Sequence, residues 1–254
     1  MLINYVITQL YYNIAIILTK HILIMKKVIL SALTVGFLFV SGATMAQVSF
    51  GPKVALNIAS QHDKAVDSEA KEDVEDYKTK VGFQVGGMLN AQINDYFAIR
   101  PELTFSNVGA KVSGDGFKGT LNHNYLLLPV NFVGQYPVSD NFKLQAFVGP
   151  YAALGLGGKF KYESGGDTFD GSVKFKKDPG TDFDNAYANP LDFGLNFGVG
   201  FQASSFVFSA SYALGLSNTE AHYSESAIED ERGNYIKTTN RNISIGVAYL
   251  FGGK

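Results

Sequence analysis

The sequence predicts an all-β protein, a closed antiparallel up-and-down transmembrane barrel of about eight strands. Three observations lead to this prediction. Large apolar residues alternate with small or polar ones along about eight segments, an export signal precedes those segments, and short turns alternate with long polar loops. A period of two gives a strand two unlike faces, and outer-membrane barrels keep short and long connections at opposite ends.

Composition favours an exported β protein and excludes several kinds of site. The 254 residues include 27 glycines, 20 phenylalanines and 14 tyrosines, and only 17% are charged. The chain has no cysteine, which excludes disulfides and thiolate metal sites, and its formal net charge is −2. A chain without excess positive charge gives no reason to expect a nucleic-acid partner. We expect no nucleic acid, no cofactor and no metal.

The N-terminal residues are expected to direct export. Residues 25–46 have the three parts of a signal peptide: Lys26 and Lys27, an apolar run over 28–40, and a small-residue segment ending at Ala46. Cleavage after Ala46 leaves a barrel domain over 47–254 in the cell outer membrane. We interpret the apolar residues 1–24 as an upstream mis-start, because Met25-Lys-Lys is a complete signal beginning. A membrane helix before the signal is the alternative.

Eight segments alternate and are the expected strands: 48–59, 81–93, 96–106, 124–136, 142–157, 191–202, 206–217 and 241–251. Each has ten or more residues, which suits a tilted crossing of the hydrocarbon layer. In 191–202 we expect Phe193, Phe197 and Phe201 to meet acyl chains. The other face, toward the barrel interior, carries Asp192, Asn196 and Gln202. Open sheet edges are too costly in lipid, so the sheet must close.

A soluble, lipocalin-like barrel is the alternative, with the bulky groups inside. Periodicity alone does not separate the two. The positions of aromatic residues near the short turns and the C-terminus favour the membrane barrel, since an interfacial girdle is expected there. These residues are Tyr96, Phe97, Tyr136, Phe142, Phe201, Phe206, Tyr249 and Phe251.

The connections differ in length and charge. Short turns are expected at 94–95, 137–141 and 203–205, and long polar loops at 59–80, 109–119, 159–188 and 217–240. The acid-rich loop 59–80 is interpreted as a solvated loop, because no spacing in it matches a calcium loop. Residues 159–177 alternate around Gly165-Gly166 and suggest a hairpin beyond the membrane or a strand extension. Besides outer-membrane lipid, an extracellular ligand or protein could bind through 59–80, 159–188 and 217–240.

Two motifs resemble a known family. In "FGPKVALNIA" (50–59), Gly51, Lys53 and Asn57 match the first-strand pattern of the PorT-like, porin-family outer-membrane barrels common in Bacteroidetes, while Ala55 replaces a glycine. "NYLLLPVNFVGQY" (124–136) resembles that family's fourth strand, with Leu127 where an acidic residue is frequent. The resemblance implies a β-barrel porin by architecture and says nothing about transport. "YLF" at 249–251 resembles the aromatic-ended last strand read by the assembly machinery.

The charges expected inside the barrel are the candidate site residues: Lys53, Arg100, Glu102, Lys143 and Asp192. An interior of about eight strands is just filled by side chains, so we expect a hydrogen-bonded plug of paired charges. The alternative is a narrow polar conduit or ligand cavity, since glycines on the inner face leave some room. We expect a non-enzymatic barrel with a structural or surface-interaction role; a narrow, porin-like pore for small solutes is the second hypothesis.

A lipid-modifying barrel enzyme is the third hypothesis. It would need a Ser/His/acid group at the outer rim, and His123 with Ser113 or Asp115 are the residues available for it. Nothing in the sequence fixes their geometry. No catalytic residue is therefore predicted.

Overall fold

The strands form a closed ring. The computed structural model describes residues 47–65, 77–114, 116–177, 186–221 and 236–252, so the signal peptide and residues 1–24 lie outside the described part. No helix in this part is long and apolar enough to cross a membrane. The ten strands are β1 (Gln47–Ala65), β2 (Lys78–Gln92), β3 (Phe97–Gly114), β4 (Phe117–Ser139), β5 (Phe142–Ser164), β6 (Asp167–Phe175), β7 (Ala186–Ala188), β8 (Leu191–Ala203), β9 (Phe206–Gly215) and β10 (Ile236–Tyr249).

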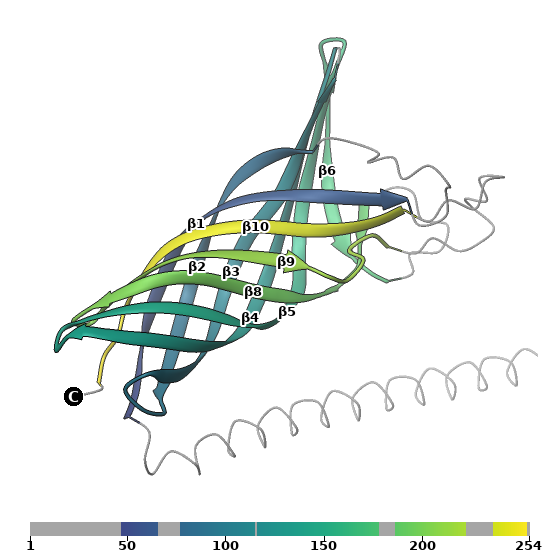
Figure 1. Ribbon diagram of the computed structural model, residues 1–254. Helices are drawn as coiled ribbons and strands as arrows, with labels where there is room; N and C mark the ends of the chain where they lie inside the picture. Colours follow the sequence, from purple (N-terminus) through teal and green to yellow (C-terminus); the bar gives the residue numbers. More distant parts are fainter. Residues whose placement is uncertain (1–46, 66–76, 115, 178–185, 222–235, 253–254) are drawn as a thin grey trace, which may run out of the picture. The chain divides into compact units, whose positions relative to one another are not determined.

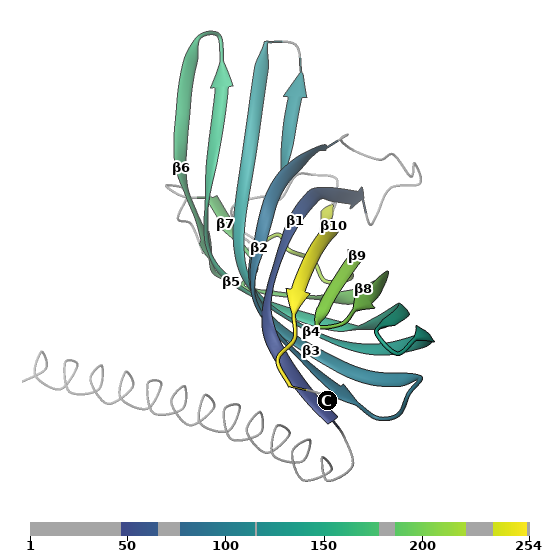
Figure 2. The same ribbon diagram turned by 90° about the vertical axis from the view of Figure 1, so that its left-hand side faces the viewer.

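Eight of these strands pair in the order β1–β2–β3–β4–β5–β8–β9–β10, and β1 pairs with β10 to close the ring (Figures 1 and 2). Every pairing in the ring is antiparallel. Closure satisfies the backbone groups of both edges, as a sheet in lipid requires. The expected eight-stranded up-and-down barrel is confirmed.

The two faces are as the alternation predicts. Along β1 every second side chain from Ser49 to Ala59 is buried, and those between them are exposed. On β8, Phe193 and Phe197 point outward, while Asp192 and Asn196 are buried inside. The bulky groups therefore cover the outer wall, which excludes the soluble barrel with its apolar residues inside.

Tight turns join β2 to β3, β4 to β5 and β8 to β9. Asn94 closes the first, because its side-chain oxygen accepts hydrogen bonds from the backbone N–H of Tyr96 and Phe97, each at 2.9 Å. Ser204 in the third turn has a φ of 53°, the left-handed conformation that such tight turns use. The C-terminal residues lie at this same end of the barrel (Figure 1).

A belt of aromatic rings lies along this end, as expected of an interfacial girdle. Successive rings lie 4.8–6.4 Å apart between centroids, from β5 across β8, β9 and β10 to β1. The pairs are Phe142–Phe201, Phe201–Phe208, Phe208–Phe206, Phe206–Tyr249, Tyr249–Phe251 and Phe251–Phe50. Tyr136 on β4 is 66% exposed. The belt places one membrane interface at the short turns.

The opposite end differs from the prediction of long loops. Residues 109–119 are no loop: β3 and β4 stay paired as far as Gly114 and Phe117. β5 continues to Ser164 and pairs with β6 around a turn at Gly165-Gly166. The apolar pattern stops where lipid stops, but backbone pairing continues into water, so counting apolar residues underestimates strand length. The middles of the other three expected loops, 66–76, 178–185 and 222–235, lie outside the described residues.

Candidate functional site

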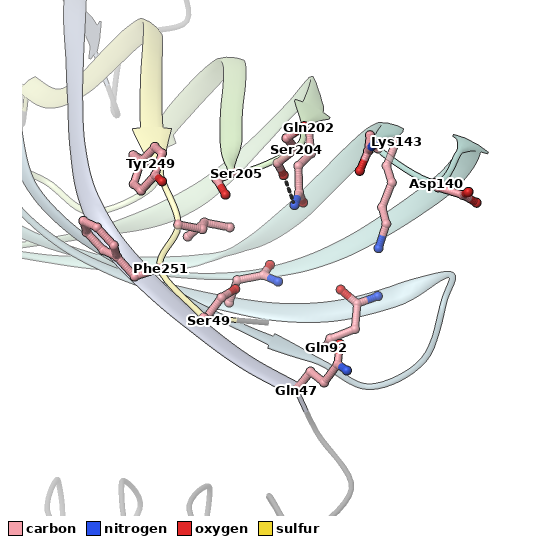
Figure 3. Close-up of a pocket in the computed structure, with 14 residues that line it drawn as sticks. Gln47, Ser49, Gln92, Asp140, Lys143, Gln202, Ser204, Ser205, Tyr249 and Phe251 are labelled. Atoms are coloured by element: carbon pink, nitrogen blue, oxygen red, sulfur yellow. Dashed lines mark hydrogen bonds between the residues drawn. The ribbon is translucent and has the colours of Figure 1, made fainter. Parts of the chain in front are cut away.

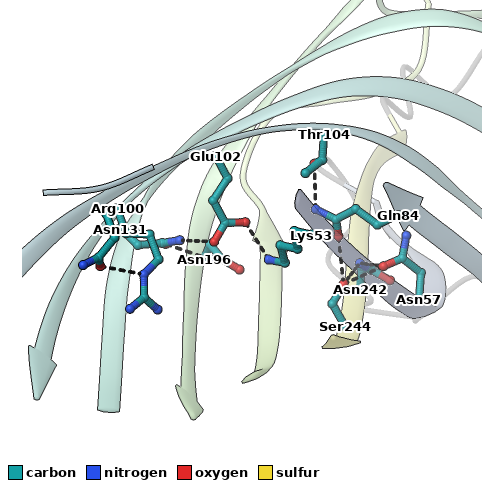
Figure 4. Close-up of polar contacts among 11 residues, drawn as sticks. Lys53, Asn57, Gln84, Arg100, Glu102, Thr104, Asn131, Asn196, Asn242 and Ser244 are labelled. Carbon is teal, nitrogen blue, oxygen red and sulfur yellow. Dashed lines mark hydrogen bonds and ion pairs between the residues drawn. The ribbon is translucent and has the colours of Figure 1, made fainter. Parts of the chain in front are cut away.

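A chain of buried polar side chains in the lumen joins four strands of the ring (Figure 4). Lys53 of β1 donates to Glu102 of β3, with Nζ 2.5 Å from Oε2. Asn131 of β4 donates to the other oxygen of Glu102 at 3.5 Å, and Asn196 of β8 donates to Asn131 at 2.9 Å. The four residues come from four strands of the ring, and each is at least nine-tenths buried. Their side chains occupy the middle of the barrel.

Arg100 organises a second layer nearer the short turns. It is only 1% exposed, and it donates to Asn90 of β2 at 3.1 Å and to Gln145 of β5 at 3.0 Å. Gln145 in turn donates to Gln135 and Gln202. The direct partners of the Arg100 guanidinium are therefore amide oxygens. Glu102 lies two residues further along β3, in the neighbouring layer. A buried charge without such partners would cost several kcal/mol.

A third layer contains only neutral groups. Asn57 of β1 is fully buried; it donates to Ser106 at 3.0 Å and accepts from Ser244 at 2.5 Å and from Asn242 at 3.2 Å. Gln84 of β2 links this layer to β3 through Thr104 at 2.7 Å. Sequence reasoning did not assign these amides, although Asn57 lies on the same alternating face as Lys53. Neutral amides carry no compositional signal that separates a lumen from ordinary surface.

Asp192 lies in a separate cluster at the long-strand end. Its carboxylate accepts hydrogen bonds from Ser217 at 2.6 Å, Asn240 at 3.0 Å and Tyr151 at 3.3 Å. Among the described residues no cation forms an ion pair with it. Hydroxyl and amide donors therefore solvate this charge in place of water. The structure thus brings Lys53 and Glu102 into contact, with Arg100 one layer away, and places Asp192 apart from them.

Aromatic rings fill the room that the inner-face glycines leave. A Cβ at Gly194 would lie 2.6 Å from the Tyr151 ring, and a Cβ at Gly198 would lie 2.6 Å from the Phe147 ring. Phe175 of β6 lies over Gly155, where a Cβ would come within 2.2 Å of it. These glycines therefore accommodate rings, and the space that the sequence suggested for a ligand is occupied there by side chains.

Lys143 lies outside all of these layers. It lines a polar cavity of about 620 Å³ at the short-turn end (Figure 3). The other lining groups are mostly amides and hydroxyls, among them Gln47, Gln92, Gln202 and Ser204. Ser204 accepts from Gln202 through its backbone oxygen at 2.9 Å. The cavity is a polar vestibule that leads to the Arg100 layer, because Asn90 belongs to both.

His123 does not form the catalytic group considered from the sequence. It is 3% exposed and packs edge-on against Tyr125 and Phe175, with ring centroids 5.9 and 5.5 Å away. Ser113 pairs with Lys118, five positions along β4 from His123, which is about 17 Å. Asp115 lies outside the described residues. The described part also holds no group of three or more His, Cys, Asp or Glu residues that could hold a metal ion.

Comparison with solved structures gives small outer-membrane proteins at low identity. Ail, the attachment invasion locus protein of Yersinia pestis, is 14% identical, with 81% of this chain and 99% of that chain covered and a TM-score of 0.34. Neisserial surface protein A is 11% identical (80% and 99% covered, TM-score 0.37). OprG of Pseudomonas aeruginosa is 13% identical (80% and 97%, TM-score 0.39). A search of curated proteins gives no match.

The family is shown by the sequence itself. Residues 41–220 match the model of the outer membrane protein beta-barrel domain, which is more than half of the chain. The match covers most of the ring, from β1 to β9, and it agrees with the closed antiparallel topology and the apolar outer wall. The chain belongs to the family of the outer membrane protein beta-barrel domain and is an integral protein of the outer membrane.

Proposed function

We propose that this protein is a closed, non-enzymatic barrel that anchors a surface-exposed structure in the outer membrane. The observation that carries the proposal is the chain Lys53–Glu102–Asn131–Asn196 across the lumen. Paired charges and hydrogen-bonded amides at this depth support a lumen that is filled by side chains. The proposal also assigns the chain to the PorT-like type, which the first-strand motif supports. It places signal cleavage after Ala46, which the export signal supports.

The described part of the surface structure is formed by strand extensions. The paired ends of β3 and β4 and the β5–β6 hairpin extend beyond the rest of the barrel (Figure 2). We infer that an extracellular ligand or protein binds here and through 59–80 and 217–240. Binding is the activity that a polar surface of this kind supports.

Planar-bilayer recording of the purified barrel tests closure. We expect no stable single-channel steps, because hydrogen-bonded side chains of the successive layers extend into the lumen. The vestibule beside Lys143 favours the second candidate, a narrow pore for small solutes. Stable ion steps from the wild-type protein would establish that pore and refute the closed barrel.

Orientation is tested by labelling cysteines in intact cells. The natural chain has no cysteine, so single replacements give clean sites. Asp167→Cys at the tip of the β5–β6 hairpin should react with a membrane-impermeant maleimide. Asp140→Cys, in the exposed β4–β5 turn at the other end, should react only after the outer membrane is opened. The reverse pattern would place the hairpin in the periplasm and refute the surface role.

A further inference from the structure

Four lysines gather on the strand extensions beyond the apolar wall. Lys78 of β2, Lys111 of β3, Lys118 of β4 and Lys161 of β5 line one cavity of about 250 Å³. Two hydroxyl groups, of Ser113 and Thr120, and a single carboxylate, of Glu163, line it with them. The extensions of β3, β4 and β5, which carry most of this cavity, stand above the ring in Figure 2. We name these seven residues the lysine cluster.

The strand register places the lysine cluster on the outer face of the sheet. The β3–β4 pairing runs without a shift from Phe105↔Leu126 up to Lys111↔Thr120 and Ser113↔Lys118. Leu126 is 37% exposed, and the Phe105 ring packs against that of Phe83, which is 50% exposed, so both face outward. Side chains alternate regularly along such a pairing, so Lys111, six residues after Phe105, points outward as Phe105 does. Lys78 joins that face because it pairs directly with Lys111. The cluster therefore continues the lipid-contacting surface upward.

Its height fits the headgroup region of a leaflet. Lys78 lies three residues before Val81, the last exposed apolar residue of β2, which is about 10 Å along the strand. Lys111 lies about 20 Å beyond Phe105 along β3, and strand tilt reduces both heights. The hydrocarbon core ends at the apolar band, so the lysines lie on its headgroup side.

Within the described residues, the lysine cluster contains one ion pair. Glu163 pairs with Lys161 at 2.5 Å, and Asp170 of β6 lies opposite Lys161. No ion pair within the described part neutralises Lys78, Lys111 or Lys118. Like charges directly opposite each other across strands are destabilising, yet Lys78 and Lys111 occupy such positions. A bound anion would remove this repulsion.

We propose that Lys78, Lys111 and Lys118, with the hydroxyls of Ser113 and Thr120, bind phosphate groups of lipid headgroups in the surrounding leaflet. Ammonium groups bind phosphate as point charges, and hydroxyl donors add hydrogen bonds to its oxygens. Free phosphate has the same chemistry. The outward direction of the cluster, continuous with the lipid face, favours the headgroup. Assignment to the outer leaflet rests on the proposed orientation, whereas phosphate binding does not.

The experiment measures thermal unfolding of the full barrel in nanodiscs by heat-modifiable gel mobility. The three arms are phosphatidylcholine alone, phosphatidylcholine with inorganic phosphate, and phosphatidylcholine with phosphatidic acid, which carries a phosphomonoester. We expect phosphatidic acid to raise the unfolding temperature and high salt to remove the increase. Equal protection by inorganic phosphate would overturn the lipid source. No protection in any arm would overturn the site.

Variants separate binding from structure. Lys111→Gln/Lys118→Gln should lose most of the phosphatidic acid effect, while in phosphatidylcholine alone it should unfold at or above the wild-type temperature, since repulsion is relieved. Lys143→Gln, which removes one lysine at the other end of the barrel, should keep the full effect. If the double variant unfolds early in phosphatidylcholine and keeps the phosphatidic acid effect, the lysines only support the fold. The unfolding temperature is measured independently of conductance and of maleimide labelling. Phosphate binding, the closed barrel and the surface orientation can therefore each be refuted without the others.

Discussion

Lys53 and Glu102 form a 2.5 Å ion pair inside the barrel although they lie 49 residues apart and on strands that do not pair with each other. Lys53 is 7% exposed and Glu102 is 4% exposed, so water solvates neither charge well. The pair therefore depends on both partners, and on Asn131, which supplies a further hydrogen bond to the carboxylate. It links β1 to β3 across β2 and begins the chain that continues through Asn131 to Asn196.

Breaking this pair from one side should be costly. Lys53→Met leaves the Glu102 carboxylate buried and unpaired, and we expect it to lower the free energy of unfolding by about 3 kcal/mol. Glu102→Gln should have a similar effect on Lys53. The double variant Lys53→Met/Glu102→Gln leaves no lone charge and should cost clearly less than the sum. Urea unfolding in lipid vesicles measures all three; strictly additive losses would show that the two charges are not coupled.

Inner-face glycines should not accept a methyl group. Gly198→Ala would place a Cβ 2.6 Å from the Phe147 ring and 2.3 Å from the Ala210 backbone oxygen, so we expect a loss of about 1–3 kcal/mol. Gly134→Ala is the matched control, because the nearest atom to its Cβ would be 3.8 Å away. Thermal unfolding in detergent compares them. Equal stability of the two variants would contradict a filled lumen at Phe147.

Phe175 should shield His123 from solvent. The two rings lie 5.5 Å apart between centroids, and His123 is almost fully buried. We expect Phe175→Ala to make His123 react with diethyl pyrocarbonate, which modifies accessible imidazoles, while the wild type reacts only at its other histidines. His62, which is partly exposed, provides the internal control by mass spectrometry. Wild-type modification of His123 at the rate of His62 would mean that the β6 segment does not cover this end.

The ion pair on the projecting hairpin should be visible in titration. Its hydrogen bond and attraction to Lys161 hold the pKa of Glu163 below the ordinary value, and Glu163 raises the pKa of Lys161. A depressed carboxyl pKa means that the pairing is present above the ordinary glutamate pKa and is lost as pH falls through the lowered value. NMR titration of the Glu163 carboxyl carbon should show this. Lys161→Gln or high salt should return the pKa toward normal; an unchanged value would refute the pair in solution.

The sequence by itself determined the class of the fold, the number of strands in the ring and the face of each strand. Alternation along 191–202 is enough to send Phe193 outward and Asp192 inward, because a strand has only two faces and lipid accepts only one of them. It also placed the aromatic girdle at the short turns. Each of these features follows from a local pattern of residues within a strand or next to a turn.

Only the tertiary structure decided which inward groups meet. Lys53 contacts Glu102, and Asp192 instead contacts Ser217, Asn240 and Tyr151, because closure and register set the depth of each residue and the wall it faces. The same register fills the space over Gly198 with Phe147 and brings Lys78 opposite Lys111. Strand ends also needed the structure, since backbone pairing beyond Gly109 and Gly157 continues in water without an apolar pattern to reveal it. The period of a strand fixes which face each of its side chains points to. Contacts between side chains of different strands depend on the register of those strands.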